Sequence, residues 1–421
     1  MNNKNSNIKK WISFIILTLG AGTIYKLCFL KDAFYVPMQQ YLGLTHTQIG
    51  NALSLSSTIT TIGFVVAIWL SDKISKRILI SAGLIGAGVL GLWLSTFPGY
   101  NAILLIWALF ALTNDMLFWP VLLKSIKSLG GKDGQGRIFG YFEASRGIVD
   151  TLVAFAALGI FAYFGSGEIG FRNAILFYAI TSIVIGIAAF FVIEDDESSS
   201  KNNKEEGKKA KVSPIQAFKT KEIWLAAFNT FFVYAIYCGI TYFIPFLKDI
   251  YALPVALVGI YGVINQYGLK MIGGPVGGYL ADKKFHSPTK YIRFGYILCI
   301  VLLVVMVIAP HKSMNVYVGM GMTLIFGAVL FSMRAVFFAP MGEINISDDI
   351  SGAAMSIGSF IGYAPGMFCF SLYGNVLDNN PGLSGYRMVF MMMIGFAVVG
   401  FIISTLLVNS IKKNKKKQEI A

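Results

Sequence analysis

The stretch NDMLFWPVLLKSIKSLGGKDGQGRIFGYFEASRGIVD, from Asn114 to Asp150, joins two long apolar segments and places charges inside both of them. On a helix, Glu143, Arg146 and Asp150 fall within about 60° of arc, because successive residues are about 100° apart. Exposing such a charged helix surface to lipid is costly, so this surface must face protein or water. The remainder of the chain can be interpreted as the structure that surrounds this charged face.

The composition predicts an all-α integral membrane protein. The chain has 421 residues, of which 56% are hydrophobic and only 13% are charged, and its mean hydropathy is +0.66. A soluble chain carries about twice that charged fraction. Apolar runs of roughly 20 residues, the length that crosses a hydrocarbon core, recur throughout. Runs of this length exclude a membrane β-barrel, whose strands alternate in short segments.

The net charge of +14 is explained by membrane topology rather than by a nucleic-acid partner. With twelve spans and both termini in the cytoplasm, 26 of the 35 Lys and Arg residues fall on the inner side, five on the outer side and four inside spans. This distribution follows the positive-inside rule, and the opposite orientation would invert it. The first span follows three lysines without a small-residue cleavage site, which predicts an uncleaved helix.

The apolar runs divide the chain into two halves of six spans. We expect an N-terminal bundle over residues 1–193, a charged cytoplasmic linker over 194–222, a C-terminal bundle over 223–409 and a basic tail over 410–421. The linker is rich in Lys, Glu, Ser and Asn and cannot bury a core. The expected spans are about 11–34, 48–70, 78–97, 102–123, 137–164, 173–193, 223–247, 254–281, 291–309, 316–340, 351–377 and 386–409.

Short motifs repeat between the halves. The motif LTHTQIG, from Leu44, corresponds to LPVALVG, from Leu253, and LSDK, from Leu70, corresponds to LADK, from Leu280. In both halves an Asp-Lys turn closes the second span. Two six-span repeats in the same orientation are typical of one large class of transporters.

The sequence of these turns resembles that of the major facilitator superfamily. The resemblance extends over essentially the whole chain. The family pattern is roughly Gly-x-x-x-Asp-Arg/Lys-x-Gly-Arg-Arg/Lys, and Ser71 and Ser75 depart from it here. Charged residues of the two copies match the pattern and are the candidate gating motif: Asp72, Lys73, Arg77, Asp282 and Lys283. More loosely, GQGRIFG, from Gly134, resembles the sugar-phosphate and organic-anion branch and poorly characterised bacterial permeases.

The resemblance implies two six-helix bundles around a central cavity lined by spans 1, 2, 4, 5, 7, 8, 10 and 11. The sequence offers an independent test, because charges inside spans should face the cavity. All seven lie on cavity spans: Lys26, Asp115, Glu143, Arg146, Asp150, Lys270 and Arg334.

The charges of spans 4 and 5 are the candidate ion-pair and coupling residues. Asp115 and Arg146 lie at similar depths on consecutive antiparallel spans, and either charge alone would be costly, so we expect them to pair. The pair could be purely structural or could break during transport. Three carboxylates cannot all pair with one Arg, so Glu143 or Asp150 could carry a proton, or be hydrogen-bonded without any role in transport.

The three remaining cations are candidate substrate-binding residues. Lys26, Lys270 and Arg334 have no acid on a neighbouring turn of their own helices. Cations that converge in a wet cavity suit a carboxylate, phosphate or sulfonate. Alternatively, each of them pairs with a carboxylate of spans 4 and 5 across the bundle. Neutral contacts could come from Tyr25, Tyr234, Gln266 and Tyr363.

We therefore predict a secondary transporter, not an enzyme, that moves a small organic anion by alternating access, through proton symport or anion exchange. The alternatives are an amphipathic drug efflux permease and a non-transporting membrane sensor with the same fold. No nucleotide motif, metal site or cofactor is indicated, and the four cysteines lie in apolar runs without a CxxC pair. The expected partners are the solute, the lipid bilayer and, in the symport alternative, protons, for a monomer in the bacterial cytoplasmic membrane.

Overall fold

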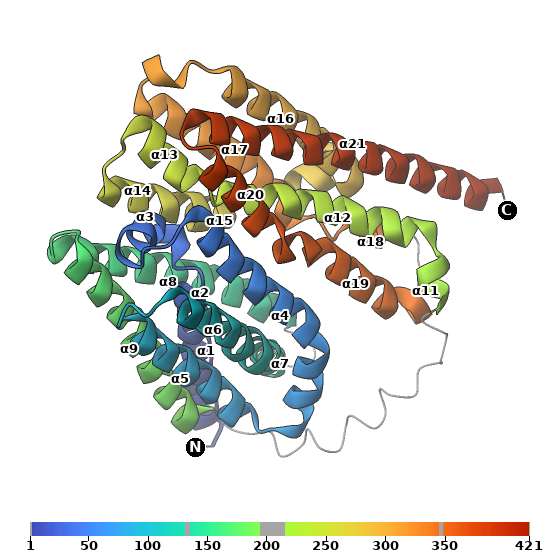
Figure 1. Ribbon diagram of the computed structural model, residues 1–421. Helices are drawn as coiled ribbons and strands as arrows, with labels where there is room; N and C mark the ends of the chain where they lie inside the picture. Colours follow the sequence, from blue (N-terminus) through green and yellow to red (C-terminus); the bar gives the residue numbers. More distant parts are fainter. Residues whose placement is uncertain (1, 131–134, 194–214, 345–347, 421) are drawn as a thin grey trace. The chain divides into compact units, whose positions relative to one another are not determined.

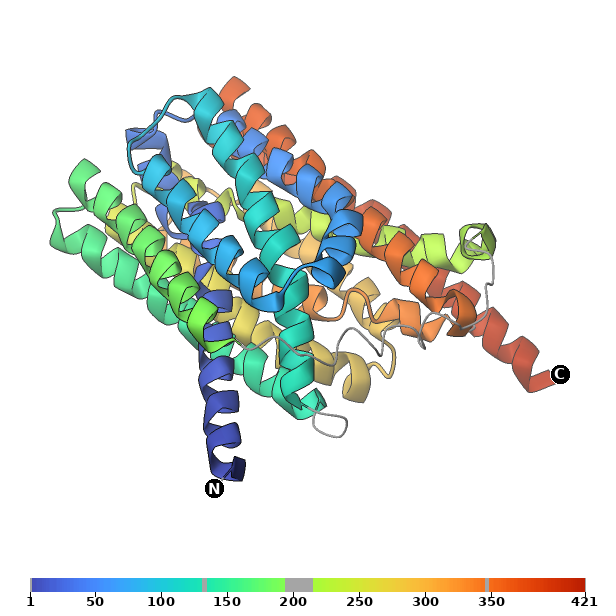
Figure 2. The same cartoon turned by 90° about the horizontal axis from the view of Figure 1, so that it is seen from below.

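The computed structural model describes residues 2–130, 135–193, 215–344 and 348–420, and everything in them that has regular structure is helical. Two compact units result. Unit 1 comprises Met1–Glu197 and Pro254–Tyr267, and unit 2 comprises Ser198–Leu253 and Gly268–Ala421. In two perpendicular views, each unit is a bundle of roughly parallel helices (Figures 1 and 2). The predicted all-α membrane fold is confirmed.

Most expected spans are found as long apolar helices. Among the described residues, eleven helical runs are long and apolar enough to cross a membrane. They correspond to expected spans 1 and 3–12. The expected second span is helix α4, His46–Lys73, whose side chains at 64–72 lie outside the described part of the chain.

Unit 1 holds the first six spans, and its first and fourth spans are interrupted. Span 1 is split into three helices, and span 4 contains a π-helical segment, η1. The elements are α1 (Asn2–Thr23), α2 (Tyr25–Cys28), α3 (Lys31–Tyr41), α4 (His46–Lys73), α5 (Lys76–Leu94), α6 (Tyr100–Phe110), η1 (Ala111–Phe118), α7 (Trp119–Gly130), α8 (Gln135–Tyr163), α9 (Glu168–Val192), α14 (Val255–Val263) and the π-helical turn η3 (Ile264–Gly268).

Small residues set the helix spacing in unit 1. Helices α5 and α9 pack against each other, and a Cβ added at Gly88 would lie 2.6 Å from the carbonyl oxygen of Ala179. A Cβ added at Gly186 would likewise lie 3.0 Å from Cβ of Leu84. Close approach through small residues is the usual way in which membrane helices associate, because lipid provides no hydrophobic force between them.

The outer half of span 8 belongs to unit 1, although it comes from the second half of the chain. Helix α14 packs against α3 and α8. A Cβ at Gly259 would lie 2.6 Å from Cδ2 of Leu158 and 3.0 Å from the carbonyl oxygen of Ala33. The predicted boundary at residue 223 assigns all of span 8 to the C-terminal bundle, whereas the structure divides this span at the π-helical turn.

Unit 2 holds the remaining spans, with a short helix before the first of them. The elements are α11 (Ile215–Lys219), α12 (Lys221–Ile240), α13 (Phe243–Tyr251), α15 (Leu269–Tyr279), η4 (Leu280–Lys284), α16 (Pro288–Ile308), η5 (His311–Ser313), α17 (Val316–Ala335), α18 (Pro340–Glu343), α19 (Asp348–Tyr363), η6 (Ala364–Met367), α20 (Cys369–Asn379) and α21 (Leu383–Ile420).

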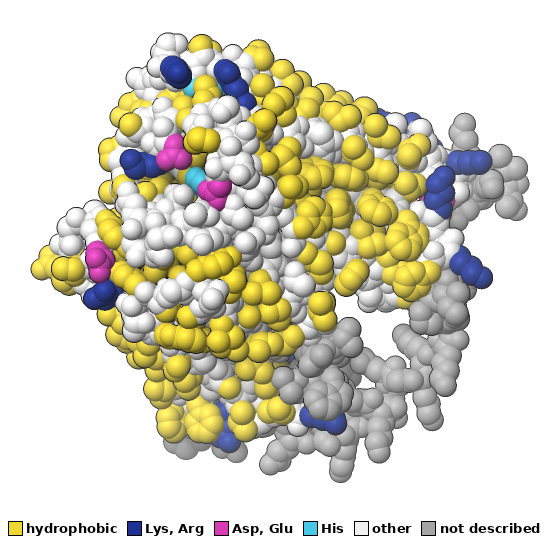
Figure 3. Space-filling view, viewed as in Figure 1, with side chains coloured by type: hydrophobic (Ala, Val, Ile, Leu, Met, Phe, Trp, Pro, Cys, Tyr) yellow, Lys and Arg dark blue, Asp and Glu magenta, His cyan; other side chains and the backbone are white. Residues whose placement is uncertain are grey.

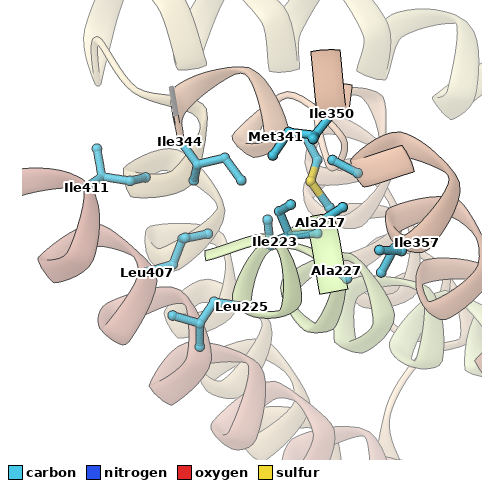
Figure 4. Close-up of a cluster of buried hydrophobic side chains, with 12 residues drawn as sticks. Ala217, Ile223, Leu225, Ala227, Met341, Ile344, Ile350, Ile357, Leu407 and Ile411 are labelled. Carbon is cyan, nitrogen blue, oxygen red and sulfur yellow. The ribbon is translucent and has the colours of Figure 1, made fainter. Parts of the chain in front are cut away.

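A buried apolar cluster joins five of these helices near the start of α12 (Figure 4). Ile223 of α12 lies within a group that includes Met341 of α18, Ile357 of α19 and Leu407 of α21. Ala217 brings the short helix α11 into the same cluster. The packing ties the ends of these helices together, so that the aromatic residues further along α12 are held in place.

The visible surface of each unit is largely apolar (Figure 3). Exposed large hydrophobic side chains are frequent on the outward faces of the helices, for example Phe191, Ile308 and Ile325. The few charged side chains on this face lie near the ends of the helices (Figure 3). Such surfaces are unusual for soluble monomers and suit contact with lipid.

A buried histidine ties the loop between α16 and α17 to unit 2. His311 is 2% exposed. Its Nε2–H donates to the carbonyl oxygen of Met306, 2.6 Å away, and its Nδ1 accepts from the Tyr251 hydroxyl, also at 2.6 Å. Burial lowers the pKa of His311, the bond to Met306 opposes this shift, and the positive charge of Arg387 adds to it.

Substituting Gly259 by Leu should destabilise unit 1, because the side chain has no room between Leu158 and Ala33. Overpacking of this kind costs about 1–3 kcal/mol. The measurement is the thermal unfolding midpoint of the purified protein. Gly274→Leu, further along span 8, is the matched control, because a Cβ there meets nothing within 4 Å. Equal midpoints for the two variants would contradict the tight packing of α14.

His311 should make stability depend on pH in one direction. Its pKa is lower in the folded protein than in the unfolded chain, so the unfolded chain binds the proton more readily. The contribution to stability is therefore complete above the usual histidine pKa of about 6.5 and is lost as the pH falls below it. Unfolding midpoints across this range should fall less steeply for His311→Gln than for the wild type. Parallel curves would contradict the assignment.

Candidate functional site

The interruption of span 1 places two predicted site residues in the interior of unit 1. Helix α1 ends at Thr23, and the four-residue helix α2 follows with Tyr25 and Lys26. A broken helix frees backbone carbonyls, which must find other partners in an apolar environment. The indole N–H of Trp107 donates to the carbonyl oxygen of Cys28 at 3.1 Å. Discontinuous helices of this kind commonly form binding sites in transporters.

Lys26, in span 1, contacts groups from two other spans. Its ammonium forms an ion pair with Asp150 of α8, and the lysine side chain is only 1% exposed. The same ammonium lies 3.5 Å from the ring centroid of Tyr267, which belongs to η3. Lys26 therefore follows the alternative in which a cation pairs with a carboxylate across the bundle. Asp150, expected one turn from Arg146, is bound to Lys26 instead.

A second ion pair in unit 1 was not recognised from the sequence. Lys31 and Asp32 are both buried in α3, with 2.5 Å between Nζ and Oδ1. The Tyr267 hydroxyl donates to the other oxygen of Asp32 at 3.2 Å. The expected first span, residues 11–34, contains both residues, but neither is among the seven charges expected inside spans. The available signal was this adjacent Lys-Asp pair inside the first apolar run. Helix α3 continues for nine residues beyond Asp32.

Asp115 lies in the π-helical segment of span 4 and does not form the expected pair with Arg146. Its Oδ1 accepts from the Tyr25 hydroxyl at 2.8 Å, and its Oδ2 accepts from the Thr60 hydroxyl at 2.6 Å. No Lys or Arg side chain in the described residues lies within 4.0 Å of this carboxylate. The π-helical segment inserts an extra residue per turn, which changes the direction of Asp115 relative to a regular helix.

Arg146 finds its acidic partner on its own helix. Its guanidinium is 2.7 Å from Oε2 of Glu143, three residues earlier, as the helical spacing predicts. The guanidinium also lies over the ring of Trp119, 5.3 Å from its centroid. Trp119 in turn contacts the ring of Tyr25 at 5.9 Å. Local pairing and an aromatic surface thus satisfy Arg146 without Asp115.

In unit 2, the half-buried side chain of Arg334 lies against aromatic rings rather than against a carboxylate. Arg334, in the last turn of α17, lies over the ring of Tyr237 at 3.8 Å and near that of Tyr234 at 5.7 Å. Tyr363 closes the group with its ring 5.0 Å from that of Tyr234. Among the described residues, no carboxylate lies within 4.0 Å of Arg334 and none of its five N–H groups donates a hydrogen bond. We call these four residues the arginine cage.

The other predicted binding residues are less closely associated with these groups. Gln266 is buried in η3 of unit 1, whereas Lys270 has an exposed side chain on α15 of unit 2. Asn265, beside Gln266, is fully buried and neither atom of its amide has a hydrogen-bond partner in the described structure. These positions do not extend the arginine cage, whose members all belong to α12, α17 and α19.

The predicted gating residues are only partly described. The side chain of Asp72 lies outside the described part of the chain. Lys73 and Arg77 are exposed, and the Arg77 guanidinium lies 4.8 Å from the ring centroid of Phe190. Asp282 and Lys283 are exposed in η4. Within the described residues, no group of three His, Cys, Asp or Glu side chains could hold a metal ion.

Comparisons with known proteins agree with this architecture. The model of the Major Facilitator Superfamily matches residues 14–347. The chain belongs to this family. Its members are secondary transporters rather than enzymes, and the predicted fold, membrane-transport class and non-enzymatic class are confirmed at that level. The matched region includes both the charged hairpin of spans 4 and 5 and Arg334.

Two curated relatives and two solved structures place the chain within the superfamily. The inner membrane protein YihN of Escherichia coli (strain K12) is 56% identical over 97% of this chain and 98% of its own length. The inner membrane protein YqcE of the same strain is 26% identical over 95% and 94%. A bacterial homologue of the human lysosomal transporter Spinster matches with a TM-score of 0.71 at 15% identity, over 96% of this chain and 97% of its own. The nucleoside transporter NupG matches with a TM-score of 0.74 at 13% identity, over 95% and 99%.

The Lys26–Asp150 pair should respond to mutation as one unit. Lys26→Met or Asp150→Asn alone removes one partner of a buried pair, which costs about 3–5 kcal/mol. The double variant should lose less than the sum of the two, because neither charge is then stranded. Unfolding midpoints of the purified proteins test this.

The control for this cycle is Arg172→Gln. Arg172 and Glu168 form an ion pair with exposed side chains, which contributes about 0–1 kcal/mol. Additive losses in the Lys26 and Asp150 variants would show that the two groups do not interact.

Proposed function

We propose that this protein moves a small organic anion, such as a sugar acid or a phosphorylated compound, across the bacterial inner membrane by alternating access. The observation that carries the proposal is Arg334, which lies on Tyr237 and has no acidic partner within 4.0 Å among the described residues. A guanidinium whose donors are not used by the protein can bind an oxyanion through two parallel hydrogen bonds.

The tyrosines around Arg334 support the same assignment. A ring stacked on the guanidinium stabilises its charge through the face, while the N–H groups in the plane remain available. Tyr234 and Tyr363 add hydroxyl groups and aromatic surface next to the cation. Hydroxyls and ring faces suit the uncharged part of an organic anion. Tyr25 and Tyr234 occupy repeat-related positions, but Tyr25 binds Asp115.

We assign different roles to the predicted binding cations. Lys26 is neutralised by Asp150, so we assign it to the charge network of unit 1 rather than to the substrate. Arg334 then carries the recognition of the anion. Lys270 remains a candidate contact. Amphipathic cation efflux is disfavoured, because a positively charged drug would meet an uncompensated guanidinium.

The proposed location rests on similarity and charge. The relative that is 56% identical is named an inner membrane protein, and the excess of Lys and Arg in the loops places both termini in the cytoplasm. We propose that the protein works there as a monomer, with Asp72, Lys73, Arg77, Asp282 and Lys283 forming the inner gating turns. Transport is driven by a gradient, through proton symport or anion exchange.

Arg334 can be tested with purified protein by ligand-dependent thermal stabilisation. Gluconate, glucuronate and glucose 6-phosphate should raise the unfolding midpoint, whereas neutral glucose should not. Arg334→Gln should weaken anion binding by about 30-fold or more, the equivalent of about 2 kcal/mol for a truncated charge pair. Arg334→Lys should retain part of the effect, because it keeps the charge and loses the fork geometry.

The control Arg172→Gln should respond to anions as the wild type does, since this side chain is exposed on unit 1 and paired with Glu168. Equal stabilisation of wild type and Arg334→Gln would reject the role of Arg334. Stabilisation by the lipophilic cation tetraphenylphosphonium alone would favour drug efflux instead.

A further inference from the structure

We infer that Asp115 is the proton-binding site of this transporter, with the hydroxyls of Tyr25 and Thr60 as the groups that accommodate the proton. The inference deepens the proposed function, since it identifies the coupling ion and the residue that carries it. It also differs from the expectation drawn from the sequence, in which Glu143 or Asp150 titrates.

Asp115 differs from the other carboxylates in having no Lys or Arg partner among the described residues. The structure describes five carboxylate side chains in the membrane-spanning helices of unit 1, the side chain of Asp72 being outside the described part, and four of the five form ion pairs. These are Asp32 with Lys31, Glu143 with Arg146, Asp150 with Lys26 and Glu168 with Arg172. Asp115 instead accepts two hydrogen bonds from neutral hydroxyls.

Protonation has opposite consequences at an ion-paired carboxylate and at Asp115. A proton on Asp150 would leave the ammonium of Lys26 buried without its counter-charge, which is strongly unfavourable. A proton on Asp115 strands no cation and removes an uncompensated negative charge from an apolar region. Proton binding is therefore less costly at Asp115 than at the ion-paired carboxylates.

The surroundings of Asp115 can satisfy both protonation states. In the ionised state, Tyr25 and Thr60 donate to Oδ1 and Oδ2. When Oδ1 carries the proton, it can donate to the Tyr25 oxygen, provided that the Tyr25 hydrogen turns to another acceptor. The carbonyl oxygen of Asn114 lies 3.4 Å from that hydroxyl. One hydroxyl rotation thus replaces the lost bond, as hydroxyl groups permit.

The π-helical segment contributes to this arrangement. The backbone N–H of Trp119 bonds to the Asn114 carbonyl five residues earlier, and a carbonyl oxygen has two lone pairs. Asn114 can therefore accept from Tyr25 without losing its backbone bond. Asp115 and Thr60 are half-buried rather than sealed, so a proton can reach the carboxylate.

The groups that act electrostatically on this site are few. Span 1 contributes Tyr25 and the thiol of Cys28, and span 5 contributes Arg146, which, like Tyr25, contacts the ring of Trp119. Span 2 contributes the neutral hydroxyl of Thr60.

The test is a pH titration of the purified protein in lipid by infrared difference spectroscopy, with no organic anion present. Acidification of the wild type should produce a carbonyl band from a protonated carboxylic acid, which shifts in deuterated buffer. Asp115→Asn should lose this band, and Asp115→Glu should restore one at a changed frequency. Tyr25→Phe should make the band appear at a higher pH, because a hydrogen bond to the ionised form is lost.

Glu143→Gln is the matched control, since Glu143 is already paired with Arg146, and it should retain the band. A band that persists in Asp115→Asn, or a wild type that shows none, would overturn the inference. Gel filtration and thermal unfolding establish that each variant is folded. The titration contains no anion, so its result is independent of the Arg334 experiments: either proposal can fail while the other stands.

Discussion

The structure depends on how an apolar chain compensates the charges that it places inside its spans. A lone ion in hydrocarbon is costly, and the cost is avoided only by an opposite charge, by hydrogen bonds or by an aromatic face. All three solutions occur here. Lys26 and Lys31 have carboxylates, Asp115 has two hydroxyls, and Arg334 has a tyrosine ring. The three solutions differ in how far the charged group remains available to bind a proton or a solute.

The helices are shaped by these requirements. Span 1 is broken on both sides of Tyr25 and Lys26, and the indole of Trp107 compensates one of the freed carbonyls. Span 4 contains a π-helical segment at Asn114 and Asp115, and span 8 contains another at Tyr267. The irregular turns therefore coincide with the polar side chains. Regular helices flank them and supply the apolar surface that lipid requires.

The fold was largely predictable from the sequence because it follows from one-dimensional quantities: the length of apolar runs, the positions of Lys and Arg, and the repeated turns at Asp72 and Asp282. The pairing of charges was not. Asp115 and Arg146 were matched by depth alone, but a π-helical segment changes the direction of one and Glu143 competes for the other three residues away. Lys31 and Asp32 lie inside the expected first span, but they were not included among its charges.

The contrast between Lys26 and Arg334 shows why the type of compensation matters for function. A carboxylate uses the donors of the cation that it neutralises, so Lys26 has little capacity left for a solute. A tyrosine face acts on the charge of Arg334 from above the plane and leaves its donors in the plane free. A carboxylate in place of the aromatic face would neutralise Arg334, and the site would no longer attract an anion. The two halves of the chain therefore differ in chemistry: the ion-paired carboxylates lie in the first half, and Arg334, in the second half, has an aromatic face in place of a carboxylate partner.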